Sequence, residues 1–214
     1  MPLVIHFLNV GHGDCTIIKF PSGRLAMVDI NNSKGLPEKD KRVLLKNLGY
    51  SDLEVTLAKT QGSTLAGLDR YKKLLVDPVD FLKATYLHEP IFRFILTHPD
   101  MDHMSGLYRL RGQEKIPIEN FWDINHAREM SKEDFENSPY EYVDWLQYAV
   151  LRRGKDEENK ATVLRLQRGV QAEYYREDGI HILAPSEKLE EQARNQDNYN
   201  ISSYVLLIKY GSCK

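Results

Sequence analysis

The chain has 214 residues, of which 42% are apolar and 28% charged, and its formal net charge is −2. These values are typical of a globular protein with one sizeable core. They exclude an overall basic field of the kind that attracts nucleic acid, although a local basic patch stays open. No apolar run has the length of a transmembrane helix, and the N-terminus has neither a basic leader nor a small-residue cleavage site. The two cysteines, Cys15 and Cys213, make no disulfide framework, so we expect a cytoplasmic protein with no membrane partner.

The first thirty residues predict three strands. Residues 3–10 are apolar on both faces, which is typical of a strand buried in a sandwich. The Gly-His-Gly-Asp turn at 11–14 ends this strand, because two glycines permit positive φ angles and a close backbone approach. Residues 15–30 predict a hairpin that carries Asp29 to a strand end and begins with Cys15 as a small core residue. His12 either lines a pocket or caps its turn, and both readings stay open.

Residues 31–90 predict a mostly helical insertion. Apolar stripes place helices at 39–48 and 65–76, and an Asp-Pro pair at 77–78 begins a short helix that ends near residue 86. The basic residues of this segment favour a solvated face over a contact with a substrate phosphate. The segment is longer than a typical connection, so we expect it to shape substrate choice near the site described next.

The most informative stretch is IFRFILTHPDMDHMSGL at residues 91–107. An apolar run predicts a buried strand at 91–97, and four side chains capable of binding a metal follow it: His98, Asp100, Asp102 and His103. Imidazole and carboxylate suit zinc and also manganese or iron, and the two carboxylates would repel each other without a cation between them. The alternative is a polar loop in which Asp102 only caps a short helix at 102–110.

The remainder predicts an alternation of strands and helices. Strands are expected at 118–124, 163–166, 172–175, 180–183 and 201–210, and helices beginning near Ser131, over 140–153 and over 187–195. The stripe of Tyr142 and Trp145 in the helix at 140–153 favours packing over a base-stacking platform. His126 follows a strand and could be a further ligand, but a hydrogen-bonded or exposed histidine is the preferred interpretation.

The run THPDMDHMSG resembles the signature of metallo-β-lactamase-fold hydrolases, whose usual form is His-x-His-x-Asp-His. Asp100 stands where the second histidine of that signature would be, as in the soluble domain of the bacterial DNA-uptake competence protein and its relatives. FLNVGHGDCTIIKFPSGRLAMVDI resembles the first strand, turn and hairpin of the same subgroup, and ISSYVLLIKYGSCK resembles a later core strand. The resemblance implies an α/β fold, an αββα sandwich of which residues 1–214 form the N-terminal part. It also places Asp29 near the floor of the active site, where a metal contact and hydrogen bonds to loop amides are both open.

In that family a strand like the last one here is followed by a bridging Asp and, later, by a further His. Neither ligand is present in this sequence. An unpaired apolar strand at 205–208 would also favour aggregation. We therefore expect the chain to be a fragment whose fold and metal site are completed by a C-terminal fragment of the same precursor or by another complementing chain.

The resemblance implies a site for two divalent metal ions, most naturally Zn²⁺ and alternatively Mn²⁺. His98 and Asp100 would hold one ion, Asp102 and His103 the other, and Asp102 would also act in catalysis by orienting the attacking hydroxide. We expect a phosphodiesterase, most simply a nuclease acting on DNA or RNA. The alternative is a non-catalytic or regulatory module of the same fold that acts through partner binding, because one fold hosts many functions.

Overall fold

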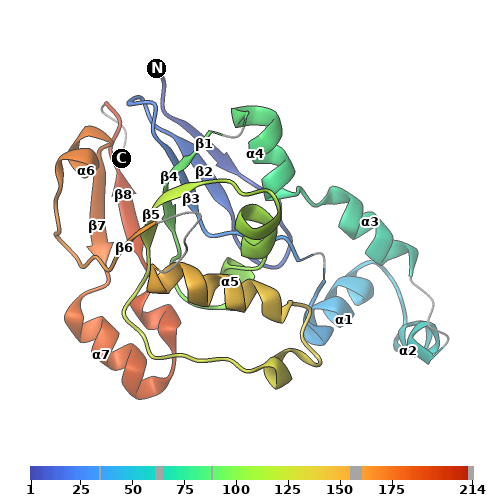
Figure 1. Cartoon of the computed structure of the whole chain (residues 1–214). Helices are drawn as coiled ribbons and strands as arrows, with labels where there is room; N and C mark the ends of the chain where they lie inside the picture. Colours follow the sequence, from blue (N-terminus) through green and yellow to red (C-terminus); the bar gives the residue numbers. More distant parts are fainter. Residues whose placement is uncertain (34, 61–64, 88, 155–160, 212–214) are drawn as a thin grey trace.

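The computed structural model describes residues 1–33, 35–60, 65–87, 89–154 and 161–211. Its largest element is a mixed six-stranded sheet in the order β1-β2-β3-β4-β5-β6 (Figure 1). β1, β2 and β3 pair antiparallel, whereas β3, β4, β5 and β6 run parallel. The strands are β1 Val4–Phe7, β2 Thr16–Lys19, β3 Leu25–Val28, β4 Ile91–Ile95, β5 Ile118–Trp122 and β6 Thr162–Leu164.

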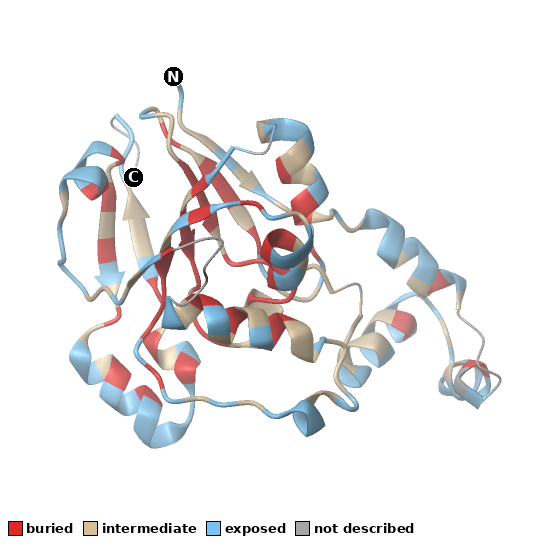
Figure 2. Cartoon of the chain, in the orientation of Figure 1, coloured by how far each residue is buried: buried red, intermediate tan, exposed pale blue. Residues whose placement is uncertain are grey.

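Helices cover one face of this sheet. Side chains that alternate along the strands, among them Ile17, Phe94 and Phe121, pack against α4, Pro78–Tyr86, and α5, Tyr142–Arg153. Figure 2 shows the buried residues concentrated along the strands and on the inward sides of these helices. The central strands are buried on both faces, which accounts for their nearly continuous apolar sequences.

A second, two-stranded sheet covers the other face. β7, Ile180–Ala184, pairs antiparallel with β8, Val205–Ile208, and α7, Glu187–Gln196, lies between them in sequence. Ile180 and Ile182 of β7 share an apolar cluster with Ile95 and Trp122 of the large sheet. A buried ion pair, Nη1 of Arg93 to Asp178 Oδ2 at 2.7 Å, also joins the two layers. The chain is therefore α/β, with helices, a mixed sheet and a second small sheet in successive layers.

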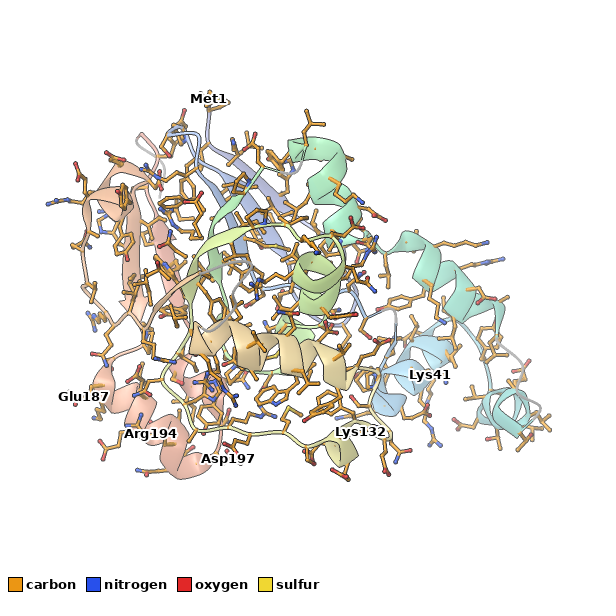
Figure 3. The ribbon with its side chains drawn as sticks, in the orientation of Figure 1. Met1, Lys41, Lys132, Glu187, Arg194 and Asp197 are labelled. Atoms are coloured by element: carbon orange, nitrogen blue, oxygen red, sulfur yellow. The ribbon has the colours of Figure 1, made fainter. Side chains whose placement is uncertain are left out.

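The expected helical insertion is present. α1, Glu38–Asn47, α3, Ala66–Leu74, and α4 confirm the helices predicted at 39–48, 65–76 and 77–86, whereas α2, Asp52–Thr60, was not predicted. α1 to α3 extend from the body of the molecule on the right of Figure 1. Lys132 and Glu187, labelled in Figure 3, are among the charged residues at the periphery.

The structure corrects four predictions from the sequence. The strand predicted at 172–175 is part of a helix, α6 Glu173–Glu177. The helix predicted at 102–110 is a 3₁₀ turn, Met101–His103, followed by a π-helix, Tyr108–Gln113, because Gly106 between them has a φ of +113°. The strand predicted at 201–210 begins as a 3₁₀ turn, Tyr199–Ser202, and only then becomes β8.

The fourth correction concerns the first strand. Residues 3–10 were expected to be buried on both faces, but β1 is an edge strand, and Phe7 and Ile5 are 81% and 39% exposed. Its apolar composition therefore does not reflect two-sided burial. Cys15 is buried, as expected, and burial raises its pKa, whereas Cys213 lies outside the described residues. In the described segments no helix combines the length and apolar character needed to cross a bilayer.

Candidate metal centre

Four parallel strands end at one edge of the large sheet, and polar residues lie at or just beyond these ends. Asp29 follows β3, Asp123 follows β5 and Arg165 follows β6, while β4 leads through Leu96 and Thr97 to His98. The strand pairing continues past these ends: the amide of Asp29 donates to the carbonyl of Ile95 at 2.9 Å, and that of Asp123 to Leu164 at 3.0 Å. Ligand sites of open α/β sheets lie at this carboxyl edge.

Asp29 is the centre of the hydrogen bonding at this edge. The buried carboxylate accepts the backbone N–H of Thr97 at 2.7 Å, the Thr97 hydroxyl at 2.7 Å and Nδ1 of His103 at 2.8 Å. Its backbone has a φ of +56°, a region that Asp and Asn tolerate better than most residues. The hydrogen bond from a loop amide confirms one of the two open interpretations of Asp29, and its contact with a metal stays a prediction.

This network sets the tautomers of both histidines. Because the Thr97 hydroxyl donates its proton to Asp29, the same oxygen can only accept the contact from Nδ1 of His98 at 3.0 Å. Nδ1 of His103 donates directly to Asp29. In their neutral forms, both imidazoles therefore present Nε2 as a free lone pair, and their ring centroids lie 4.0 Å apart.

Each Nε2 faces carboxylates. For His103, Nε2 lies 3.5 Å from Asp102 and 3.9 Å from Asp14, and for His98 it lies 3.4 Å from Asp100. The structure thus brings together the pairs expected to share a metal, and it adds Asp14 from the Gly-His-Gly-Asp turn. Burial would lower the pKa of His103, but the hydrogen bond and charge of Asp29 outweigh it and raise that pKa.

Gly13 allows the turn to approach the second pair. Its φ is +135°, and a Cβ there would lie 2.2 Å from the carbonyl oxygen of Asp102. The amide of Asp14 donates to the same carbonyl at 3.3 Å. The glycine is therefore needed for both conformation and space, and it keeps Asp14 beside Asp102.

Asp100 has additional partners. Its carboxylate forms an ion pair with Arg128 and accepts Nδ2 of Asn200 at 3.1 Å. Burial would raise the pKa of Asp100, but its contacts with His98 and the charge of Arg128 hold it well below the usual range. Of the four predicted ligands, Asp100 is the one paired with an arginine in the described part of the chain.

No group of three or more His, Cys, Asp or Glu side chains in the described part of the chain is arranged to hold a metal ion. The predicted ligands are gathered as two pairs at one edge, and their donor atoms are of the types that zinc and manganese accept.

The other two candidate histidines have different surroundings. His12 contacts the Tyr140 hydroxyl at 2.8 Å and Asp40 at 3.5 Å, so it joins the turn to the insertion. His126 is buried and hydrogen-bonds the Tyr148 hydroxyl. The structure therefore agrees with the interpretation of His126 as a hydrogen-bonded histidine rather than a further metal ligand.

Sequence reasoning did not select three residues of this edge: Asp14, Thr97 and Arg128. Asp14 directly follows Gly13, and Thr97 directly precedes His98. Their positions next to these motif residues could therefore have identified them. Arg128 follows the ligands by more than twenty residues, and no local pattern marks it.

Searches of known protein-family models and of the curated proteins found no match to this chain.

Proposed function

We propose that this chain belongs to a metal-dependent hydrolase of the metallo-β-lactamase fold that cleaves phosphodiester bonds in DNA or RNA. The observation that carries the proposal is the network around Asp29. One buried carboxylate, directly and through Thr97, aims Nε2 of both His98 and His103 towards acidic side chains. Metal-binding histidines are commonly oriented in this way by a carboxylate on the other ring nitrogen.

The donor set fits two divalent ions, Zn²⁺ or Mn²⁺. His98 and Asp100 would hold one, and His103 and Asp102 the other, with Asp14 near the second pair. When bound, such ions polarise a phosphoryl oxygen and lower the pKa of water. Asp102 would accept a hydrogen bond from the attacking water and orient it, and Asp29 would keep His103 in the required tautomer.

We further propose that the remaining ligands come from a C-terminal fragment or another complementing chain. Two pairs of ligands leave open coordination positions, since zinc takes four ligands and manganese more. Val205 at the start of β8 is 49% exposed, so apolar surface is available there for added structure. The described chain alone is then expected to bind metal weakly and to have little activity.

The test uses the complete protein, in which the remaining ligands are supplied, and combines metal-binding calorimetry with cleavage of plasmid DNA in Mn²⁺ or Zn²⁺. His103→Ala should lose metal binding and any cleavage while its circular dichroism stays native. The matched control is His181→Ala, which removes a partly exposed histidine from β7. Full metal binding and cleavage in a His98→Ala, Asp102→Ala double variant would contradict the proposal.

A non-catalytic module that acts through partner binding is the second candidate. The ion pair of Asp100 with Arg128 and its hydrogen bond from Asn200 favour it, because they satisfy a predicted ligand without a metal. Under this alternative, the calorimetry should show no binding of either ion at millimolar concentration.

A further inference from the structure

Arg128 connects the candidate metal centre to a separate cavity. Besides its contact with Asp100, Arg128 lines a cavity of about 640 Å³ between α5 and the segment that follows β5. This volume lies within the range of small-ligand pockets. Among the described residues, four guanidinium groups line it, from Arg128, Arg152, Arg153 and Arg165, together with one carboxylate, Glu129.

Two of these arginines, Arg152 and Arg165, lie close to the buried carboxylate of Asp123. Nε of Arg152 lies 3.2 Å from Asp123 Oδ2, and an Nη of the same arginine donates to the carbonyl of His126 at 3.2 Å. Arg165 lies 3.7 Å from Asp123, which is too far for a hydrogen bond. Within the described part of the chain, Asp123 thus orients two cations but neutralises only one charge.

The pKa of His126 reflects the positive charge of this region. Burial, the larger cause, and the charges of Arg152, Arg128 and Arg165 together lower its pKa to about 3. Its Nδ1 accepts the backbone N–H of Arg128 at 3.0 Å, as expected of a neutral imidazole. The arginines therefore remain the dominant charges at the cavity wall.

The apolar wall is less suited to reading bases. Trp145, which lines the cavity, is only 6% exposed and packs against Tyr148 with ring centroids 5.2 Å apart. Little of its face is left for stacking. Recognition would depend on the guanidinium groups, whose planar fork of donors matches phosphate oxygens and is always charged.

We propose that this cavity is a phosphate-binding subsite that holds a backbone phosphate of a nucleic-acid strand whose neighbouring phosphodiester lies at the His98–His103 edge. The subsite itself stands on the cavity and its arginines, and only the identity of the bond beside it rests on the function proposed above. Contacts with phosphates position a strand without reading its sequence, so the subsite is expected to be indifferent to base.

The experiment measures binding by the whole chain in EDTA, where no metal-dependent cleavage occurs. The probes are a short fluorescein-labelled single-stranded oligonucleotide, followed by anisotropy, and pyrophosphate, followed by calorimetry. An Arg153→Gln, Arg165→Gln double variant should weaken oligonucleotide binding by at least about tenfold and should flatten its dependence on salt. The matched control is Arg42→Gln, Arg70→Gln, which removes two exposed arginines from α1 and α3 and should bind as the wild type does.

The two probes distinguish the sources of phosphate. If the wild type binds both the oligonucleotide and pyrophosphate, and the Arg153→Gln, Arg165→Gln variant loses both, the cavity is a subsite for a strand. If the wild type binds pyrophosphate alone, the ligand is a small phosphorylated molecule and the strand is excluded. Unchanged binding of both probes in the double variant would overturn the subsite. In the complete protein, a His103→Ala variant that binds the oligonucleotide normally but cleaves nothing would support both proposals. Binding by the unchanged complete protein without any metal-dependent cleavage would leave the subsite and remove the nuclease.

Discussion

Replacing Asp29 by Asn tests the hydrogen-bond network at the candidate metal centre with little change in shape. Asn tolerates the left-handed backbone at this position as Asp does, so the φ of +56° adds no strain. The amide oxygen can still accept the N–H of Thr97. The other carboxylate oxygen, which accepts both the Thr97 hydroxyl and Nδ1 of His103, becomes an NH₂ donor.

The magnitude follows from these contacts. Two hydrogen bonds to a buried charged acceptor are lost, and rotation of the Thr97 hydroxyl recovers part of their energy, so we expect a loss of about 1–3 kcal/mol in the free energy of unfolding. The NH₂ group favours the His103 tautomer that carries its proton on Nε2, and that tautomer cannot bind a metal through Nε2. Loss of such an orienting partner lowers metal affinity roughly 10- to 100-fold.

Two measurements check this prediction. Calorimetry with Mn²⁺ or Zn²⁺ gives the affinity, and long-range ¹H–¹⁵N spectra of the imidazoles give the tautomers. The wild type should show protonated Nδ1 in His103 and the Asn variant protonated Nε2. An unchanged tautomer together with unchanged metal affinity would refute the role assigned to Asp29.

Three further predictions concern other parts of the structure. Gly13→Ala should shift the turn away from Asp102 and cost about 1–3 kcal/mol or more, because its Cβ would meet the Asp102 carbonyl. Asp178→Ala should cost about 3–5 kcal/mol in urea unfolding, because it leaves the buried Arg93 without its carboxylate. Burial raises the pKa of Asp144 to about 6, so the folded state keeps a proton that the unfolded state releases, and stability falls as pH rises from about 4 to 6. Asp144→Asn should remove this fall, which amounts to about 3 kcal/mol.

Control variants check the first two of these predictions, and a pH profile checks the third. Gly169→Ala places the same side chain at a φ of +82°, where no described atom beyond the neighbouring residues lies within 4 Å, so only backbone strain should remain. Glu177→Ala removes a half-exposed partner of Arg24 and should cost less than about 1 kcal/mol. A pH profile of Asp144→Asn parallel to that of the wild type would show that folding does not raise the pKa of Asp144.

The parts of the fold that the sequence predicted are those where local pattern and tertiary burial agree. Residues 91–97 form an apolar run between two turns, and β4 is indeed buried within the sheet. In residues 172–175 the two disagree. Two adjacent tyrosines favour a strand, but Tyr175 packs on Trp122 from a helix, with ring centroids 5.1 Å apart. Such a contact between distant residues is not visible in a local pattern.

In the candidate site too, residues close in sequence were predictable, whereas contacts between distant residues were not. The four predicted ligands lie within six residues, so a local motif was enough to select them. Their hydrogen-bond partners were harder to assign: Asp29 is 74 residues from His103, and only the parallel pairing of β3 with β4 brings them together. Arg128 reaches Asp100 from beyond β5, and nothing in its own neighbourhood predicts that contact.

The contact between Arg128 and Asp100 also makes the two proposals interdependent. Asp100 is a predicted metal ligand, whereas Arg128 lines the cavity, so each site contributes one member of the same ion pair. A cation that binds Asp100 weakens the hold of that carboxylate on Arg128 and leaves the guanidinium available to an anion. By linkage, an anion that draws Arg128 away must favour the cation to the same extent.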